Sequence, residues 1–245
     1  MKILTWNVNR DNLFNEYACN FLLDECFDII FLQEVNLCNL ENIRSIFVNY
    51  DYFISKEKIS SFSGEIEYYL VTLINKLLPC YYFSSDSLLL KTNRSLLYRL
   101  CNRSIYIEYT KVVVCIREKN ITLVNCHLQY ATSPSVRITQ LSDIISNIDT
   151  DYFILSGDLN TFSKFPLSIF IGGIMSYSWY EYMINESKIL LNSPRFLSGN
   201  DINTTIYYTG KLDWILLSKE FYFIEEFTLP RLGSDHYPLV VICEV

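Results

Sequence analysis

The sequence has only two histidines and seven glycines, and its eight cysteines include no Cys-x-x-Cys pair. The ligand spacing of a structural zinc site is therefore absent, and the scattered cysteines do not indicate a disulfide framework. No apolar run reaches the ~18–20 residues that cross a bilayer, so we expect no membrane segment. A strand pattern begins at Lys2 without a secretory leader, which predicts an intracellular protein, cytoplasmic or nuclear, with reduced thiols.

Half of the 245 residues are apolar, which is ample for a buried core, and no Gly-, Pro- or Ser-rich linker divides the chain. We therefore expect one domain over residues 1–245. The net charge of −7 opposes tight, non-specific binding of nucleic acid. It does not exclude a nucleic-acid substrate, because local Lys and Arg together with bound cations can hold a phosphate in an acidic protein.

The spacing of apolar residues predicts strands that alternate with helices early in the chain and mainly strands at the end. This order is typical of an α/β protein with mixed sheets. The polar segments 56–65 and 185–205 are interpreted as loops. Strands are expected near 2–6, 28–32, 51–55, 68–75, 80–84, 104–109, 111–117, 121–126, 151–155, 211–218, 221–228 and 238–244, and helices near 14–25, 39–47, from Ser133 onward and over 165–184.

Both histidines lie at the ends of expected strands. His127 follows Val124-Asn125-Cys126, and His236 lies in Gly233-Ser234-Asp235-His236. A lone histidine is more often packed or on the surface than catalytic, but Asp213 changes this balance. It lies in an apolar strand, where an unpaired charge is costly. We expect it to bind and orient the His236 imidazole, as carboxylates do in many active sites.

Other strand ends carry oxygen-rich side chains. Glu34 directly follows an apolar strand, Asn7 and Asn9 stand two residues apart, and so do Asp158 and Asn160. Each pattern alone is as compatible with a turn or a solvated strand end. Together they provide what phosphoryl transfer requires, namely oxygen ligands for a hard cation, a group that orients water, and donors for charge on phosphorus oxygens.

Basic and aromatic side chains are weaker candidates, because most of them are surface or core residues. Contacts to substrate are expected from Asn9, Asn125, Arg137 and Lys211. Further phosphate contacts could come from Arg94, Arg99 and Arg103, and base stacking from Trp179, Tyr180 and Tyr182.

Taken in order, six segments resemble the endonuclease/exonuclease/phosphatase superfamily, which includes abasic-site nucleases, deoxyribonucleases, tyrosyl-DNA phosphodiesterases, sphingomyelinases and inositol polyphosphate phosphatases. Single motifs are weak, but six in this order are specific. They are Thr5-Trp6-Asn7, Leu32-Gln33-Glu34-Val35, Asn125-Cys126-His127, Gly157-Asp158-Leu159-Asn160, Lys211-Leu212-Asp213-Trp214 and Ser234-Asp235-His236. The resemblance implies a four-layered α/β sandwich, in which helices flank two packed mixed β-sheets and the site lies at one edge.

The resemblance also implies roles for the site residues. Mg²⁺ or Mn²⁺ would bind near Glu34, with Asn7 and Asp235 close by. Asp158 would orient or deprotonate the attacking water, and Asn160 would bind the phosphate. His236, held by Asp213, would stabilise the pentacovalent state. His127 resembles an extra histidine of the deoxyribonuclease, tyrosyl-DNA phosphodiesterase and sphingomyelinase branches, which the abasic-site nucleases usually lack.

The expected function is a Mg²⁺-dependent phosphodiesterase that acts on DNA as a monomer, with a lean towards the tyrosyl-DNA phosphodiesterase branch or a generic member. Arg137-x-x-Gln140-Leu141 also resembles that branch, whereas Asn9 stands where many relatives have Asp and 162–210 matches nothing in them. An enzyme of the same fold acting on a lipid or inositol phosphate is the alternative. A non-catalytic binding module is a third reading, but such a protein should have lost some of the site residues, and none is missing.

Overall fold

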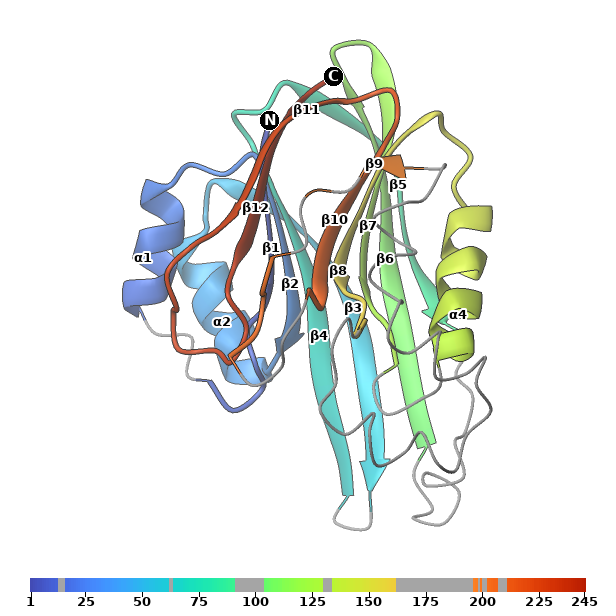
Figure 1. Ribbon diagram of the computed structural model, residues 1–245. Coiled ribbons are helices and arrows are strands. Elements are labelled where there is room, and N and C mark those ends of the chain that lie inside the picture. Colours follow the sequence, from blue (N-terminus) through green and yellow to red (C-terminus); the bar gives the residue numbers. More distant parts are fainter. Residues whose placement is uncertain are drawn as a thin grey trace.

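The computed structural model describes residues 1–12, 16–61, 64–90, 104–129, 134–161, 196–197, 199, 202–206 and 211–245. Figure 1 shows strands running through the middle of the molecule, with α1 and α2 on one side and α4 on the other. The helix predicted over 165–184, the three arginines between 94 and 103, and the aromatic residues between 179 and 182 lie outside the described residues. Within them, no helix is long and apolar enough to cross a membrane.

The elements follow the predicted alternation closely. The helices are α1 (Glu16–Asp24), α2 (Leu37–Ile46) and α4 (Pro134–Ser146). Asn36 caps α2, because its side-chain oxygen accepts the N–H of Asn39 at 2.8 Å. The strands are β1 (Lys2–Asn7), β2 (Ile29–Val35), β3 (Tyr50–Ser61), β4 (Gly64–Asn75), β5 (Cys80–Leu90), β6 (Ser104–Ile116), β7 (Lys119–His127), β8 (Tyr152–Asp158), β9 (Phe196–Leu197), β10 (Asp213–Ser218), β11 (Tyr222–Thr228) and β12 (Leu239–Glu244).

These twelve strands form one mixed sheet, in the order β11-β12-β1-β2-β4-β3-β6-β7-β8-β10-β9, with β5 paired to β6 off this path. The predicted mixed α/β class is confirmed. The connectivity differs from the two sheets expected, because β3 pairs with both β4 and β6 and so joins the two halves. The halves face each other, with β1 against β8 and β10 and β2 against β7 and β8.

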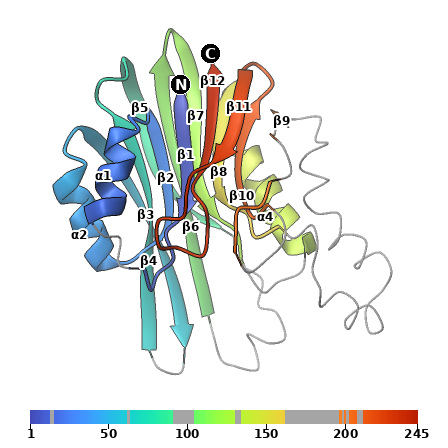
Figure 2. The same cartoon turned by 60° about the vertical axis from the view of Figure 1, so that its left-hand side comes forward.

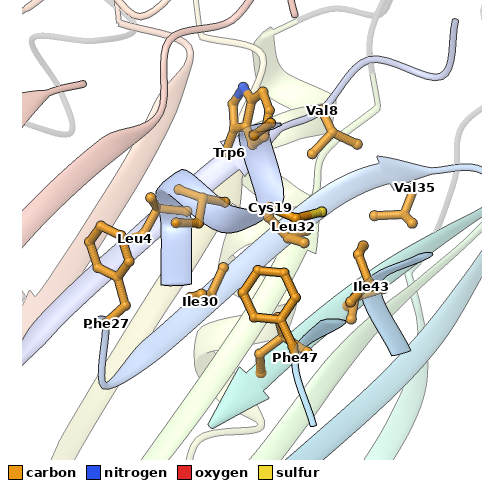
Figure 3. Packing of buried hydrophobic residues seen from close by; sticks show 14 of the residues in the cluster. Leu4, Trp6, Val8, Cys19, Phe27, Ile30, Leu32, Val35, Ile43 and Phe47 are labelled. Carbon is orange, nitrogen blue, oxygen red and sulfur yellow. The ribbon is translucent and has the colours of Figure 1, made fainter. Parts of the chain in front are cut away.

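Three groups of buried side chains fill this arrangement. The central group lies between the halves of the sheet and includes Ile3, Phe31, Leu123 and Ile154. A second group packs α1 and α2 against the outer face of β1, β2 and β4; Figure 3 shows Trp6, Phe27 and Phe47 within it. A third group packs α4 against the outer face of β7, β8 and β10. Because strand side chains alternate between faces, β1 and β2 supply both the central and the outer group.

The loop predicted over 56–65 is wrong. β3 and β4 pair residue for residue from Tyr50–Asn75 to Ser61–Gly64, so both strands continue through this polar segment. Figures 1 and 2 show the resulting hairpin extending beyond the ends of the neighbouring strands. Continuous cross-strand hydrogen bonding outweighs the low strand propensity of its charged residues. Glu57, which lies in this segment, is therefore part of a strand and not of a loop.

Candidate active site

The predicted site residues meet because of how the strands pair. β1 runs parallel to β2, and β7 runs parallel to β8, so the carboxyl end of each pair opens on one side. β10 is antiparallel to β8, and β12 is antiparallel to β1, which brings their amino ends to the same place. All six motif segments therefore converge at one edge of the halves, as expected for ligand sites at strand ends.

Asp158 lies at the centre of this edge and is 2% exposed. The strand register places His127 of β7 opposite it on one side and Asp213 of β10 opposite it on the other. Its Oδ1 accepts the main-chain N–H of Asn160 at 2.8 Å, and its Oδ2 accepts Asn7 Nδ2 at 3.0 Å. These bonds fix the carboxylate in one orientation, with Oδ2 towards the other site residues.

Gly157 permits this close packing of β7 and β8. It has a φ of +142°, and a Cβ at this position would lie 1.7 Å from the carbonyl oxygen of Cys126. No larger residue fits there without separating the two strands. Because Cys126 and Gly157 directly precede His127 and Asp158, this glycine sets how closely the two functional side chains approach.

The predicted Asp213–His236 pair is present. Asp213 is fully buried, and its Oδ2 lies 2.8 Å from His236 Nδ1. Thr204 Oγ1 accepts the main-chain N–H of Asp213 at 3.1 Å and so fixes the start of β10. Ser234 ties the histidine segment to β1, because its Oγ donates to the Asn7 carbonyl at 2.7 Å and accepts the His236 N–H at 3.0 Å.

A second carboxylate–histidine pair was not predicted. Glu57, on β3, is 4% exposed, and its carboxylate oxygens lie 3.1 Å from His127 Nδ1. The sequence signal was weak, since Lys56-Glu57-Lys58 reads as a solvated loop. The only available clue was period-two alternation, which places Glu57 on the face opposite Lys56.

The neighbouring carboxylates favour the charged form of both histidines. Burial alone would lower the pKa of His127, but the charges of Glu57, Asp158 and Glu34 raise it to about 10. Burial likewise opposes protonation of His236, whose pKa the charges of Asp213, Asp158 and Asp235 raise to about 10.

The two imidazoles also face the same atom. The Nε2 atoms of His127 and His236 lie 3.7 and 3.8 Å from Asp158 Oδ2, beyond hydrogen-bond length. Two charged N–H groups therefore surround this oxygen without being bonded to it.

The outer part of the site is rich in oxygen atoms. Asn7 Nδ2 donates to Glu34 Oε1 at 3.2 Å as well as to Asp158, so two carboxylates converge on one neutral amide. Asp235 joins this part through Asn9, whose Nδ2 donates to Asp235 Oδ1 at 2.7 Å. Converging carboxylates repel each other, and a divalent cation would neutralise them. This oxygen donor set fits a hard cation such as Mg²⁺ or Mn²⁺.

Asp158, Asp213 and His236 also bring possible ligand atoms within 4.8 Å of one another. In that set, however, Asp213 Oδ2 is already bonded to His236 Nδ1. A cation that keeps this hydrogen bond would have to bind His236 Nε2, which requires the imidazole to lose a proton that the neighbouring carboxylates favour by raising its pKa to about 10. The group around Glu34 and Asn7 is therefore the better fit for a cation.

Three site residues adopt a backbone conformation that side chains other than glycine rarely take. Asn9, Glu34 and Asn160 have φ values of 58°, 54° and 50°. Asparagine tolerates this region, but glutamate has no local hydrogen bond that compensates, and the cost is roughly 1–2 kcal/mol. At Glu34 the β2–β4 register shifts between Leu32 and Val35. Such strain is typical of functional positions.

Three residues expected to contact substrate lie elsewhere. Lys211 is fully buried, forms an ion pair with Glu226 and lies 4.5 Å from the centre of the Trp214 ring, which leaves it no exposed surface for a substrate. Asn125 is also fully buried. It accepts from Gln33 at 2.9 Å and donates to the carbonyls of Leu32 and Val71, tying β7 to β2 and β4. Arg137, on α4, is 2% exposed, which leaves little surface for a substrate.

No protein-family model and no curated protein matches this sequence. Solved structures do match. TDP2 from D. rerio, complexed with a single-strand DNA product, aligns with a TM-score of 0.64 at 18% identity over 100% of this chain and 99% of its own. An endonuclease/exonuclease/phosphatase from Beutenbergia cavernae aligns with a TM-score of 0.73 at 13% identity, over 100% of this chain and 71% of its own. A mannosyl-6-phosphatase from Bacteroides thetaiotaomicron aligns with a TM-score of 0.61 at 12% identity over the full length of both chains.

At these identities the alignments establish a common fold, and fold alone does not determine activity. They nevertheless extend over the whole of this chain, as the six motifs did. The resemblance inferred from the sequence is confirmed at that level. The chain has the fold of the endonuclease/exonuclease/phosphatase superfamily.

Proposed function

We propose that this protein is a hydrolytic enzyme, a phosphodiesterase that depends on a divalent cation. The observation that carries the proposal is the position of Asp158 Oδ2, which lies 3.7 and 3.8 Å from the Nε2 atoms of two histidines. A carboxylate that can orient water thus lies beside two imidazolium groups that can donate to phosphorus oxygens. Each imidazole is held at Nδ1 by a buried carboxylate, which limits the reorganisation needed during reaction.

Within this proposal, Asp158 orients the attacking water and accepts its proton. His236 donates from Nε2 to the oxygens on which negative charge develops, and Asp213 stabilises the charged imidazole. His127 acts in the same way from the β7 side, oriented by Glu57. Asn160 donates to the phosphate from the second N–H of its Nδ2, since the first donates to the Leu128 carbonyl at 2.9 Å.

The cation is assigned to Glu34, Asn7 and Asp235, and Mg²⁺ or Mn²⁺ suits these oxygen donors. When bound, the cation supplies charge neutralisation for the phosphate and its developing negative charge. Asn9 supports the group by fixing Asp235 through their 2.7 Å hydrogen bond. Glu34 and Asp235 come from opposite ends of the sequence, so the cation also links β2 to the segment before β12.

DNA is the proposed substrate, and an end-processing or repair reaction is the proposed context. Support comes from TDP2 of D. rerio, which shares the fold and whose structure contains a single-strand DNA product. We further propose a monomer with one domain, in which the three groups of buried side chains separate four layers. A phosphatase acting on a lipid, inositol or sugar phosphate is the second candidate, because a mannosyl-6-phosphatase has the same fold.

The test is cleavage of labelled oligonucleotides in Mg²⁺ or Mn²⁺. The panel contains an intact duplex, an abasic duplex, a single strand and a 5′-tyrosyl end. We expect cleavage of at least one member that EDTA abolishes and that Asp158→Asn lowers by at least about 10²-fold. Circular dichroism and thermal unfolding of the variant would verify that it is folded.

Each outcome has a definite meaning. Cleavage that persists in Asp158→Asn would reject the assigned role of Asp158. If no oligonucleotide is cleaved but inositol or sugar phosphates are, the DNA proposal fails and the phosphatase takes its place. If none of these substrates reacts in either metal, the proposal of a hydrolase fails.

A further inference from the structure

The many carboxylates of the site would repel an anionic substrate. Five of them converge, from Glu34, Glu57, Asp158, Asp213 and Asp235, against two histidines. A phosphodiester brings a further negative charge, and a nucleic acid brings one for every nucleotide. Cations beyond the reacting centre are therefore needed to hold a substrate that extends past it.

Arg10 supplies such a cation at the outer part of the site. Its main-chain N–H lies 3.4 Å from Glu34 Oε2, so the residue is adjacent to the proposed cation ligands. Its side chain is 45% exposed, and its Nε lies 3.5 Å from Asp11, whose own side chain is 84% exposed. An exposed ion pair of this kind contributes little and is readily exchanged for a phosphate contact.

The backbone around Arg10 is held on both sides. The N–H of Asn12 donates to the carbonyl of Asn9 at 2.9 Å, which closes a turn with Arg10 near its tip. Asn36 Nδ2 donates to the Arg10 carbonyl at 2.8 Å, while the Arg10 N–H points to Glu34. The arginine therefore projects from a fixed turn, and only its side chain has to move to meet a ligand.

Tyr68 is a neighbour of the guanidinium. Burial raises the pKa of the Tyr68 phenol and the nearby charge of Arg10 opposes this rise; the residue is 5% exposed. Tyr68 is the cross-strand partner of Glu57, so it shares the face of the β3–β4 hairpin that holds His127. β4 lies on the side of β2 away from β1 and β12. Burial opposes the charge of the guanidinium, whereas Tyr68 and Glu34 raise its pKa, so it lies near the hairpin as well as near Glu34.

Lys56 does not serve this role equally well. It adjoins Glu57 on β3, and alternation places it on the opposite face of the hairpin. There it lies 6.0 Å from the centre of the Tyr69 ring and 3.8 Å from Glu67. Tyr69 belongs to the outer group of buried side chains under α2, so Lys56 points away from the histidines.

We propose that Arg10, beside Tyr68, binds a phosphate of the substrate that flanks the one being hydrolysed. The substrate strand then runs from the two histidines across Glu34 and along the inner face of the β3–β4 hairpin. This inference rests on the proposed function and narrows its substrate class to compounds with at least two linked phosphates, such as an oligonucleotide.

The test compares two substrates in the same Mg²⁺ or Mn²⁺ buffer. One is a single-stranded oligonucleotide, and the other is bis-p-nitrophenyl phosphate, a phosphodiester with no flanking phosphate. In Arg10→Gln, the ratio of kcat/KM for the oligonucleotide to that for the small ester should fall about tenfold, as expected for one charge-assisted hydrogen bond. Tyr68→Phe should lower the same ratio by a smaller factor.

Salt dependence gives an independent readout. The slope of log kcat/KM for the oligonucleotide against log salt concentration should be shallower by about 0.7 in Arg10→Gln, because one phosphate contact is lost. Arg44→Gln is the matched control, since Arg44 is an exposed arginine in the last turn of α2. This control should change neither the substrate ratio nor the slope.

The outcomes separate the inference from the function on which it rests. If the wild-type protein cleaves both substrates and Arg10→Gln lowers both equally, Arg10 does not bind a flanking phosphate and the inference is overturned. An unchanged ratio with an unchanged salt slope overturns it as well. If the wild-type protein cleaves neither substrate in either metal, the proposed phosphodiesterase fails first and the inference falls with it.

Discussion

The two carboxylate–histidine pairs have the same chemistry but are built in opposite ways. On one side of Asp158, the neighbouring strand supplies a histidine, His127, and its carboxylate comes from β3. On the other side, the neighbouring strand supplies a carboxylate, Asp213, and its histidine comes from the segment before β12. In both cases one partner is fixed by its sheet register against Asp158, and the other comes from a segment that does not pair with β8. Similar chemistry therefore depends on different parts of the chain.

The supports of the two pairs differ as well. Asp213 begins β10, where Thr204 holds its main chain and the buried Lys211–Glu226 ion pair lies two residues earlier. Glu57 lies in a hairpin that extends beyond its neighbours (Figure 1), and it is supported by strand pairing alone, with Tyr68 of β4 on one side and Ile107 of β6 on the other. We infer that the Asp213–His236 pair is the more rigid of the two. The following variants test this contrast, from the largest expected effect to the smallest.

His236→Ala should have the largest effect on activity. The resemblance assigns this residue to the pentacovalent state, and its loss also leaves Asp213 buried without its partner. We expect kcat to fall about 10⁴-fold, equivalent to about 5.5 kcal/mol of transition-state stabilisation. Steady-state kinetics measures the loss. A variant that keeps a tenth of wild-type turnover would remove His236 from the catalytic centre.

Glu226→Ala should have the largest effect on stability. The side chains of Lys211 and Glu226 are both 0% exposed, so the substitution leaves a buried lysine without its carboxylate partner. We expect the free energy of unfolding to fall by roughly 3–5 kcal/mol. Urea unfolding measures this change. Glu225→Ala is the control, because Glu225 is the exposed neighbour on β11. Equal stability of the two variants would contradict the proposed support of β10.

His127→Ala should reduce kcat less than His236→Ala, by about 10²-fold or roughly 2.7 kcal/mol. The reason is that relatives of the abasic-site nuclease branch usually lack a histidine here, so the reaction can proceed without it. Glu57→Gln should cause a smaller loss in the same direction, because it removes the charge that orients the imidazole. Losses equal to those of His236→Ala and Asp213→Asn would show that the two pairs contribute equally.

Glu34→Gln should distinguish the two histidines by their pKa values. The Glu34 carboxylate, 4.0 Å from His127 Nε2, is one cause of the raised pKa of His127, whereas Asp213, Asp158 and Asp235 raise that of His236. The pKa of His127 should therefore fall and that of His236 should not. NMR titration in EDTA can measure both, because the chain has only two histidines.

The same titration predicts a change in stability with pH. The pKa of His127 lies above its ordinary value of about 6.5, so its charge stabilises the fold fully below that pH. The contribution is lost as pH rises towards about 10. Glu34→Gln should move the loss to lower pH. If Glu34→Gln changed the pKa values of both histidines by the same amount, the assignment of Glu34 to the His127 side would be contradicted.

The sequence was most informative where an apolar strand ends in a polar motif. Asp213 could be paired with His236 because a carboxylate in an apolar strand needs a partner, and Glu34 could be assigned because it follows a buried strand. Glu57 could not be found in this way, since the segment around it is charged and its pattern is that of a loop. The burial of Lys211 could not be predicted, because its partner, Glu226, lies fifteen residues away on another strand. The buried hydrogen bonds of Asn125 could not be predicted either, because they cross between the halves of the sheet.

The position of β12 has a consequence for how the protein folds. β12 is the last strand in the sequence, and it lies inside the sheet between β11 and β1. It therefore pairs with the first strand of the chain. Such pairing between distant segments makes folding slow. The entropy of closing a very large loop is lost before the contacts between the two strands can stabilise the fold. During synthesis, Asn7 and Glu34 emerge early but cannot meet Asp235 and His236 until the chain has grown past residue 244. A nascent chain therefore contains most of the proposed catalytic residues before β12 can pair with β1 and complete the proposed site.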